Sequence, residues 1–177
     1  MEGLAVAYSW NDSDNQDLWT LTVEEVALLP GMTNKGRIGF AVQLKSMELH
    51  GRFPECHNEL DPSAVQWLAI QLSTTAEMLA SYEFGGRQGQ RHRRTICAVL
   101  DFRPTNGTDL QRLGKWLGEE VLPFDPQAGH GREMAHDWFR AQRLEPPACD
   151  HLDRVIRSSV RSYETRQQAI IHALECR

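Results

Sequence analysis

Apolar residues recur at helical spacing along most of the chain from Thr20 onward, and no segment alternates as a half-buried strand does. One such stripe is formed by Leu110, Leu113, Leu117 and Val121. The pattern predicts an all-α fold of seven or eight helices. The expected helices are a short one after Thr22, then 35–49, 62–72, 74–82, 90–100, one carrying the 110–121 stripe, 127–143 and 150–175.

Capping signals support several of these boundaries. Thr22 and Glu25 form a capping box, in which the hydroxyl accepts a backbone hydrogen bond and the carboxylate reaches back. Asn34 is expected to cap the 35–49 helix, which Gly51 ends, and Asp61 to cap the helix that begins at Pro62. Thr74 starts a second expected capping box.

We expect three regions along the chain. Residues 1–19 lack helical periodicity and contain the polar run Asn11–Asp17, so they predict an acidic, irregular tail. Residues 20–104 predict one helical subdomain, and residues 105–177 a second helical subdomain.

Composition narrows the class of protein. With 41% hydrophobic and 24% charged residues, the chain is typical of a globular protein. No apolar run approaches the roughly 18 residues of a membrane span, and no secretion signal is recognisable, so we expect a cytoplasmic protein without a membrane partner. The four cysteines lack the spacing of a zinc site, so we expect inert thiols and neither metal nor cofactor.

The 35–49 helix is apolar on most of its circumference, which is typical of a buried central helix. Its narrow polar stripe is made by Gly39, Gln43 and Ser46. Two interpretations remain open: the stripe packs against another helix, which we favour slightly for Gly39 alone, or it faces a DNA groove.

The 90–100 helix has two contrasting faces. Ile96, Val99 and Leu100 form the apolar one, and His92 falls among them as an expected core histidine. Arg91 and Arg94 lie opposite. Arginines near a helix start, after a glycine-rich segment, suit phosphate; the competing interpretation is a solvated charged face.

Charge is unevenly distributed. The net charge is −5, yet residues 1–30 contain six acidic residues and no Lys or Arg, so the remainder carries +1. The segment from residue 85 to residue 103 contains five arginines and one aspartate, so its local charge is +4. A phosphate backbone responds to such a local patch within a Debye length of about 10 Å.

Two further patterns have simpler explanations. Glu133 and His136 have the Glu-x-x-His spacing of carboxylate-bridged metal sites, but a second such pair is missing, so chance explains it best. Arg154, Arg157 and Arg161 form a basic stripe in the last helix, which we attribute to pairing with acidic residues of the same helix.

Several blocks of the sequence resemble the amino-terminal domain of class II (Tn-three family) transposases, itself described as a domain of unknown function. They are, in order, Leu21-Thr-Val-Glu-Glu25, Lys35-Gly-Arg-Ile-Gly-Phe-Ala-Val-Gln-Leu-Lys45, Gly51-Arg-Phe53, Pro62-Ser-Ala-Val-Gln-Trp-Leu-Ala-Ile-Gln-Leu72, Tyr82-Glu-Phe-Gly-Gly-Arg87, His92-Arg-Arg-Thr-Ile96 and Leu100-Asp-Phe-Arg-Pro104. Their order and spacing make the resemblance strong over residues 20–104, and weaker matches continue to residue 156. Asp101 departs from the family's usual glycine.

The resemblance implies helix-turn-helix-like modules that hold the terminal inverted repeat of a transposon, with double-stranded DNA as the partner. It makes residues 20–104 the expected DNA-binding subdomain. In that family strand transfer belongs to a carboxy-terminal ribonuclease-H-like domain, which these residues do not include, so we expect no catalysis. The alternative is a stand-alone helical interaction module that regulates or docks on full-length transposase, or binds a second copy of itself. A further alternative is an inactive relic of a transposase.

The expected DNA contacts are basic and amide side chains of the 35–49 and 90–100 helices and of neighbouring residues. At about five phosphate contacts, the slope of log K against log salt would be −4 to −5. These residues are Arg37, Gln43, Lys45, Arg52, Arg87, Gln90, Arg91, Arg93, Arg94 and Arg103.

Overall fold

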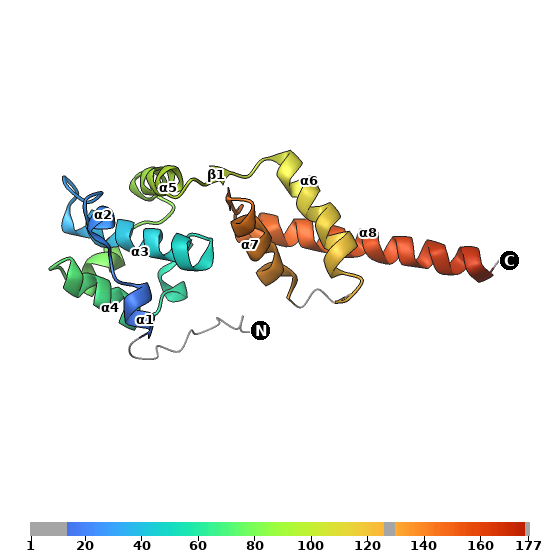
Figure 1. The fold of residues 1–177 in the computed structure, drawn as a ribbon, viewed down its shortest axis with the longest axis horizontal. Coiled ribbons are helices and arrows are strands. Elements are labelled where there is room, and N and C mark those ends of the chain that lie inside the picture. Colours follow the sequence, from blue (N-terminus) through green and yellow to red (C-terminus); the bar gives the residue numbers. More distant parts are fainter. Residues whose placement is uncertain (1–13, 126–129, 176–177) are drawn as a thin grey trace. The chain divides into compact units, whose positions relative to one another are not determined.

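The fold is all-α, as the apolar periodicity predicted. A computed structural model describes residues 14–125 and 130–175 (Figure 1). Its elements are α1 (Asp14–Leu18), α2 (Val23–Val26), α3 (Asn34–His50), η1 (His57–Glu59), α4 (Pro62–Gln71), η2 (Ala76–Ser81), α5 (Arg87–Val99), β1 (Arg103–Pro104), α6 (Gly107–Trp116), η3 (Leu117–Val121), α7 (Gly131–Ala141), β2 (Leu144–Glu145) and α8 (Cys149–Glu175). The strands are only two residues long and pair in parallel with each other.

The chain forms two compact units, the first ending at Leu100 and the second beginning at Asp101. Residues 101–104, which we expected in the first subdomain, belong to the second unit. The reason is β-pairing: Arg103 is in register with Leu144, and its backbone N–H donates to the Arg143 carbonyl at 3.1 Å.

In the first unit α3 is the central helix, and it contacts α4, η2 and α5. Thr33 caps its start by accepting from the backbone N–H of Gly36, so the cap lies one residue before the expected Asn34. Gly51 ends it in the left-handed conformation at φ 66°, as expected. The side chains from Ile38 to Met47 are all buried, so the core surrounds this helix.

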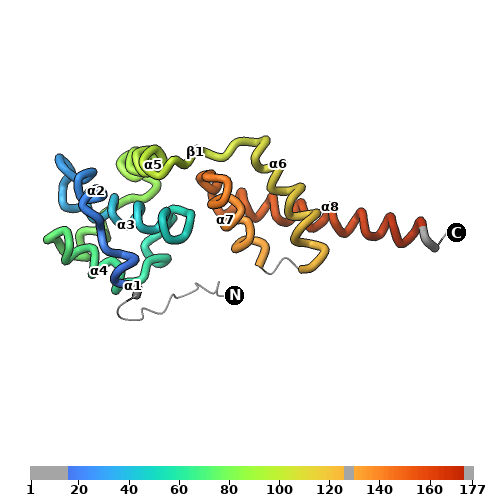
Figure 2. The backbone as a smooth tube through the Cα atoms, in the orientation of Figure 1, coloured from blue at the N-terminus to red at the C-terminus, as the bar shows by residue number. Residues whose placement is uncertain are grey.

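In the second unit, α6, η3 and α7 pack around the first half of α8 (Figure 2). Their core is a cluster of aliphatic and aromatic side chains that includes Leu113, Leu117, Phe139, Leu152 and Ile156. The predicted 110–121 stripe therefore is a core stripe. The helix that carries it continues from α6 into the π-helical turn η3.

Three local expectations differ from the structure. Part of the predicted tail is ordered: Asp14–Leu18 is helical and Trp19 is buried, while residues 1–13 lie outside the described part of the chain. Thr74 caps nothing, because the chain there forms the short 3₁₀ helix η2, whose cap position is Thr75. The expected helix at 127–143 is α7, which starts at Gly131; residues 126–129 are not described.

Within residues 14–125 and 130–175, no helix combines the length and the apolar character needed to cross a bilayer.

Candidate nucleic-acid interface

The helix α5 is amphipathic and begins three residues earlier than its apolar pattern indicated. Gly86 is its cap residue, and the side chain of Gln90 donates to the Gly85 carbonyl at 3.1 Å, which fastens the first turn. His92, Ile96 and Cys97 on one face are buried, and the helix packs on α3. The earlier start adds Arg87 to the regular part of the helix.

The opposite face of α5 carries Arg87, Arg91 and Arg94, and all three are exposed. Positions separated by four and three residues lie on one side of a helix, so these guanidinium groups follow one line. In the part of the chain that the structure describes, none of the three pairs with a carboxylate. A line of unpaired arginines is therefore available to an anionic partner.

Buried hydrogen bonds attach the apolar face of α5 to α3. The Tyr82 hydroxyl lies 2.7 Å from His92 Nδ1 and accepts from Gln43 Nε2, also at 2.7 Å. Since the hydroxyl's proton is then directed at Nδ1, the neutral imidazole carries its proton on Nε2. Burial lowers the pKa of His92, the charge of Arg91 lowers it further, and burial also raises the pKa of Tyr82. The network thus links α3 to α5 through uncharged groups.

Two glycines allow this close packing. A Cβ atom on Gly39 would lie 2.4 Å from the Tyr82 ring, and one on Gly89 would lie 2.2 Å from the Phe84 carbonyl oxygen. Gly39 is therefore a packing residue, which decides between the two interpretations of its stripe. Tyr82 itself was overlooked as an anchor; the signal was a glycine within an otherwise apolar helix, which leaves room for a large ring.

The expected DNA contacts on α3 are wrong for Gln43 and Lys45. Gln43 has no exposed surface, and its Oε1 is buried without a partner, while Ser46 beside it is 4% exposed. Lys45 is 5% exposed, and its Nζ lies 2.7 Å from Glu25 Oε1 and 3.0 Å from Glu48 Oε2. Burial raises the pKa of Glu25, but hydrogen bonds from Lys45 and from the Thr22 backbone outweigh it and leave this pKa lowered.

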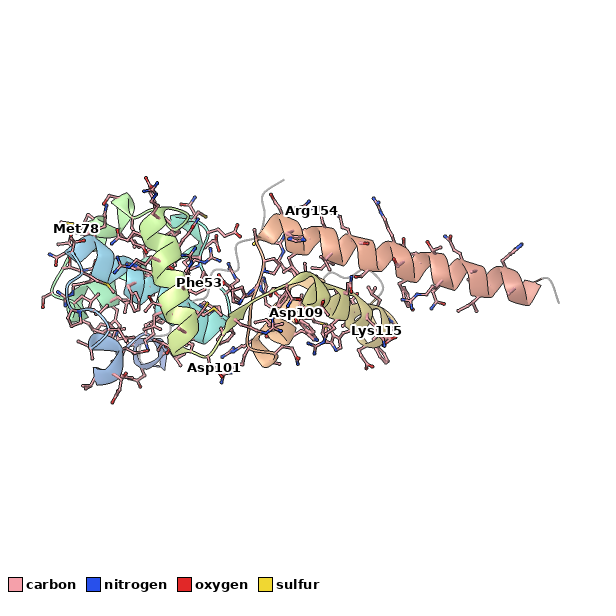
Figure 3. The ribbon with its side chains drawn as sticks, turned by 90° about the horizontal axis from the view of Figure 1, so that it is seen from above. Phe53, Met78, Asp101, Asp109, Lys115 and Arg154 are labelled. Carbon is pink, nitrogen blue, oxygen red and sulfur yellow. The ribbon has the colours of Figure 1, made fainter. Side chains whose placement is uncertain are left out.

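Other expected contacts have internal partners. Arg103 makes a bidentate pair with Asp109, at 2.7 and 2.8 Å, and this pairing lowers the pKa of Asp109 to about 2 (Figure 3 marks Asp109 on α6). Arg52 pairs with Glu59. The Arg93 guanidinium lies 4.8 Å from the centre of the Phe53 ring, so it points away from the line of α5 arginines.

Two expected contacts stay near α5. Gln90 is exposed but already holds the Gly85 carbonyl. Arg37 is half-buried in the first turn of α3, and the neighbouring Gly36 lies against the side chain of Gln88. The starts of α3 and α5 are therefore adjacent.

The basic stripe of α8 does not pair along its own helix as expected. Asp153 instead makes a bidentate pair with Arg132 of α7, at 2.6 and 2.7 Å, and Arg154 donates from Nε to the Asp150 backbone carbonyl. Arg157 and Arg161 are exposed. Asp153, the acidic partner that the spacing along α8 offered, is therefore paired with a residue of another helix.

The remaining chemical candidates form no cluster. Glu133 is exposed and His136 half-buried on α7. Within the described ranges, no three His, Cys, Asp or Glu side chains are grouped as metal ligands would be. Cys56 is an exposed thiol, Cys97 is buried and Cys149 is half-buried, while Cys176 lies outside the described residues.

Comparison with known proteins identifies the family of the chain. No curated protein matches the chain significantly. A family profile described as "Domain of unknown function (DUF4158)" matches residues 4–159, which is most of the chain and both of its units. The chain belongs to this DUF4158 family.

Proposed function

We propose that the first unit binds double-stranded DNA through the exposed face of α5, and that the chain is the amino-terminal, non-catalytic part of a Tn-three-family transposase that recognises transposon terminal inverted repeats. The observation that carries the proposal is the line of Arg87, Arg91 and Arg94. These side chains are exposed and without acidic partners among the described residues.

The helix is suited to this task because its two faces have different roles. Its apolar face is anchored in the core by Tyr82 and by the packing of Gly89. An anchored helix presents its arginines with little loss of backbone freedom on binding, which favours affinity. Arginine offers a bidentate fork to phosphate oxygens or to the guanine edge in the major groove.

The proposal depends on the arginine side chains of α5 and not on phosphate binding at the N-terminus of the helix. Glu83 lies against Gly86, since a Cβ atom on that glycine would be 2.9 Å from Glu83 Oε2. A carboxylate there already occupies the position where the helix dipole would favour a phosphate. We therefore expect Glu83→Gln to strengthen DNA binding rather than weaken it.

Salt dependence gives a quantitative expectation. With three arginines neutralising phosphates, log K should fall against log salt with a slope of about −3. This is shallower than the slope of −4 to −5 expected for about five phosphate contacts. The difference arises because Lys45 is buried against Glu25 and the Arg93 guanidinium lies over the Phe53 ring.

The decisive experiment compares two double charge reversals by fluorescence anisotropy. The probe is a pool of duplexes of about 30 base pairs, roughly three helical turns, with a randomised centre, and a second probe carries the ends of a class II transposon. Arg91→Glu with Arg94→Glu should abolish binding to both. Arg157→Glu with Arg161→Glu imposes the same charge change on α8 and should leave most of the affinity.

Equal losses from both pairs would show attraction to net charge alone and would refute the α5 interface. Binding to both probes with equal affinity would refute recognition of the inverted repeat while leaving DNA binding intact. Circular dichroism of each variant checks that helicity is unchanged.

A further inference from the structure

The second unit contains a groove between α6 and α8, about 450 Å³ in volume. Leu110 of α6 and Val155 of α8 supply apolar side chains to its lining. Gly114 of α6 lies against Ser159 of α8, since a Cβ atom on that glycine would be 3.3 Å from the serine Oγ. Because Gly114 and Ser159 are small, their side chains do not fill the space between the two helices.

Basic side chains from α8 border the same groove. Arg154 and Arg166 line it, and no described acidic residue does (Figure 3 labels Arg154 on the first turns of α8). Each of the two donates from Nε to a backbone carbonyl of its own helix, at 3.3 and 3.4 Å. In the described part of the chain neither has a carboxylate partner, so the groove has a positive charge that nothing there balances.

The spacing of the two arginines indicates the shape of the partner. They are twelve positions apart on one continuous helix, which corresponds to about 18 Å at 1.5 Å per residue. An extended peptide advances about 3.3 Å per residue, so five or six residues span that length. Val155 directly follows Arg154 on α8, so an apolar side chain in the half of the peptide that meets Arg154 would contact Leu110 and Val155.

We propose that the α6–α8 groove docks an extended acidic peptide segment of a partner protein, with one carboxylate near Arg154, another near Arg166 and an apolar residue in the half that meets Arg154. The apolar lining favours a peptide over a phosphate backbone, because a phosphodiester chain gains nothing from Leu110 or Val155. This site is separate from the α5 arginine face, and it uses none of its residues.

The test uses the full chain and a fluorescein-labelled six-residue peptide with Glu at both ends and Leu at the third position. Anisotropy should report binding that weakens about tenfold when Arg154→Gln and Arg166→Gln are combined, because each exposed ion pair contributes modestly. The matched control, Arg157→Gln with Arg161→Gln, changes the same charge on the same helix outside the groove lining and should change affinity less than about twofold.

Several results would overturn the proposal. They are an absence of peptide binding up to millimolar concentration, equal weakening by the two variant pairs, and equal binding of a peptide with Gln in place of both Glu. Duplex DNA that binds with the same dependence on Arg154 and Arg166 would assign the groove to nucleic acid instead. Because Arg91 and Arg94 remain intact throughout, failure here leaves the proposed function of α5 untouched, and failure there leaves this groove untouched.

Discussion

The helices α3 and α5 of the first unit share some sequence features and differ in which side chains they expose. Both contain a glycine, both carry basic residues, and both were expected to contact DNA. In α3 the polar side chains face inward, where Gln43 meets Tyr82 and Lys45 meets Glu25. In α5 the polar side chains of Arg91 and Arg94 face outward without acidic partners among the described residues.

The width of the apolar face explains the difference. A helix that is apolar around most of its circumference has neighbours on every side, so its few polar groups must find partners inside the protein. A helix with one apolar face keeps a side for solvent or for a ligand. Polar residues on the first kind of helix therefore predict buried hydrogen bonds, and those on the second kind predict a surface.

The largest effect should come from removing the buried charge of α3. Lys45→Met leaves Glu25 and Glu48 without their cation, and breaking a buried pair costs about 3 kcal/mol of unfolding free energy. Urea unfolding measures it. Lys115→Met, at an exposed position on α6, is the matched control and should change stability by less than about 0.5 kcal/mol. A stable Lys45→Met protein with weakened DNA binding would restore the DNA-contact interpretation.

A smaller loss should follow from filling the space beside Tyr82. Gly39→Ala puts a methyl group into the Tyr82 ring at 2.4 Å, and overpacking of this kind costs about 2 kcal/mol. Gly85→Ala, where a Cβ atom meets nothing within 4 Å, is the control and should be nearly neutral. Chemical denaturation compares the two. Equal midpoints for both variants would contradict the packing role of Gly39.

These results bear on what the sequence could predict. Apolar spacing indicated the all-α class, and the caps at Thr22, Asp61 and Gly51 were correct because each depends on residues within one turn. The burial of Gln43 and Lys45 depends on Tyr82 and Glu25, which are 39 and 20 positions away. The pairing of Asp153 with Arg132, 21 positions earlier, displaced the expected pairs along α8 for the same reason. Helix caps could be predicted because they depend on neighbouring residues. The partners of buried or charged side chains could not, because they lie far away in the sequence.

Substitutions at the carboxyl ends of α3 and α5 should change the unfolding free energy by about 1 kcal/mol or less. Gly51 follows α3 at φ 66°, and Asp101 comes after the end of α5 at φ 57° (Figure 3), where the resembling family usually has glycine. Gly51→Ala should lower stability by about 1 kcal/mol, and Asp101→Gly should raise it by about 0.5 kcal/mol, since a left-handed backbone strains a side chain. Thermal unfolding measures both. A loss of stability in Asp101→Gly would mean that the carboxylate contributes more than the strain costs.

The buried His92 should make the anchoring of α5 sensitive to pH. Its pKa is lowered in the folded protein, so the unfolded chain binds the extra proton first as pH falls below about 6.5. The histidine's contribution is therefore complete above that pH and is lost as pH falls through the folded pKa. His92→Asn keeps an acceptor for Tyr82 and should remove this part of the slope below about pH 6.5. Identical pH slopes for the two proteins would contradict the prediction.

The smallest effect on stability should come from the exposed face of α5. Arg91→Gln removes one charge that no described carboxylate balances, so the unfolding free energy should change by less than about 0.5 kcal/mol. DNA affinity should nevertheless fall, and the slope of log K against log salt should become shallower by about 1, because one phosphate contact is lost. Lys45→Met is the opposite case, with a large loss of stability and an unchanged salt slope for the fraction that remains folded. If Arg91→Gln left the slope unchanged, the outward-facing arginines of α5 would be solvated charges, and α5 would differ from α3 in burial alone.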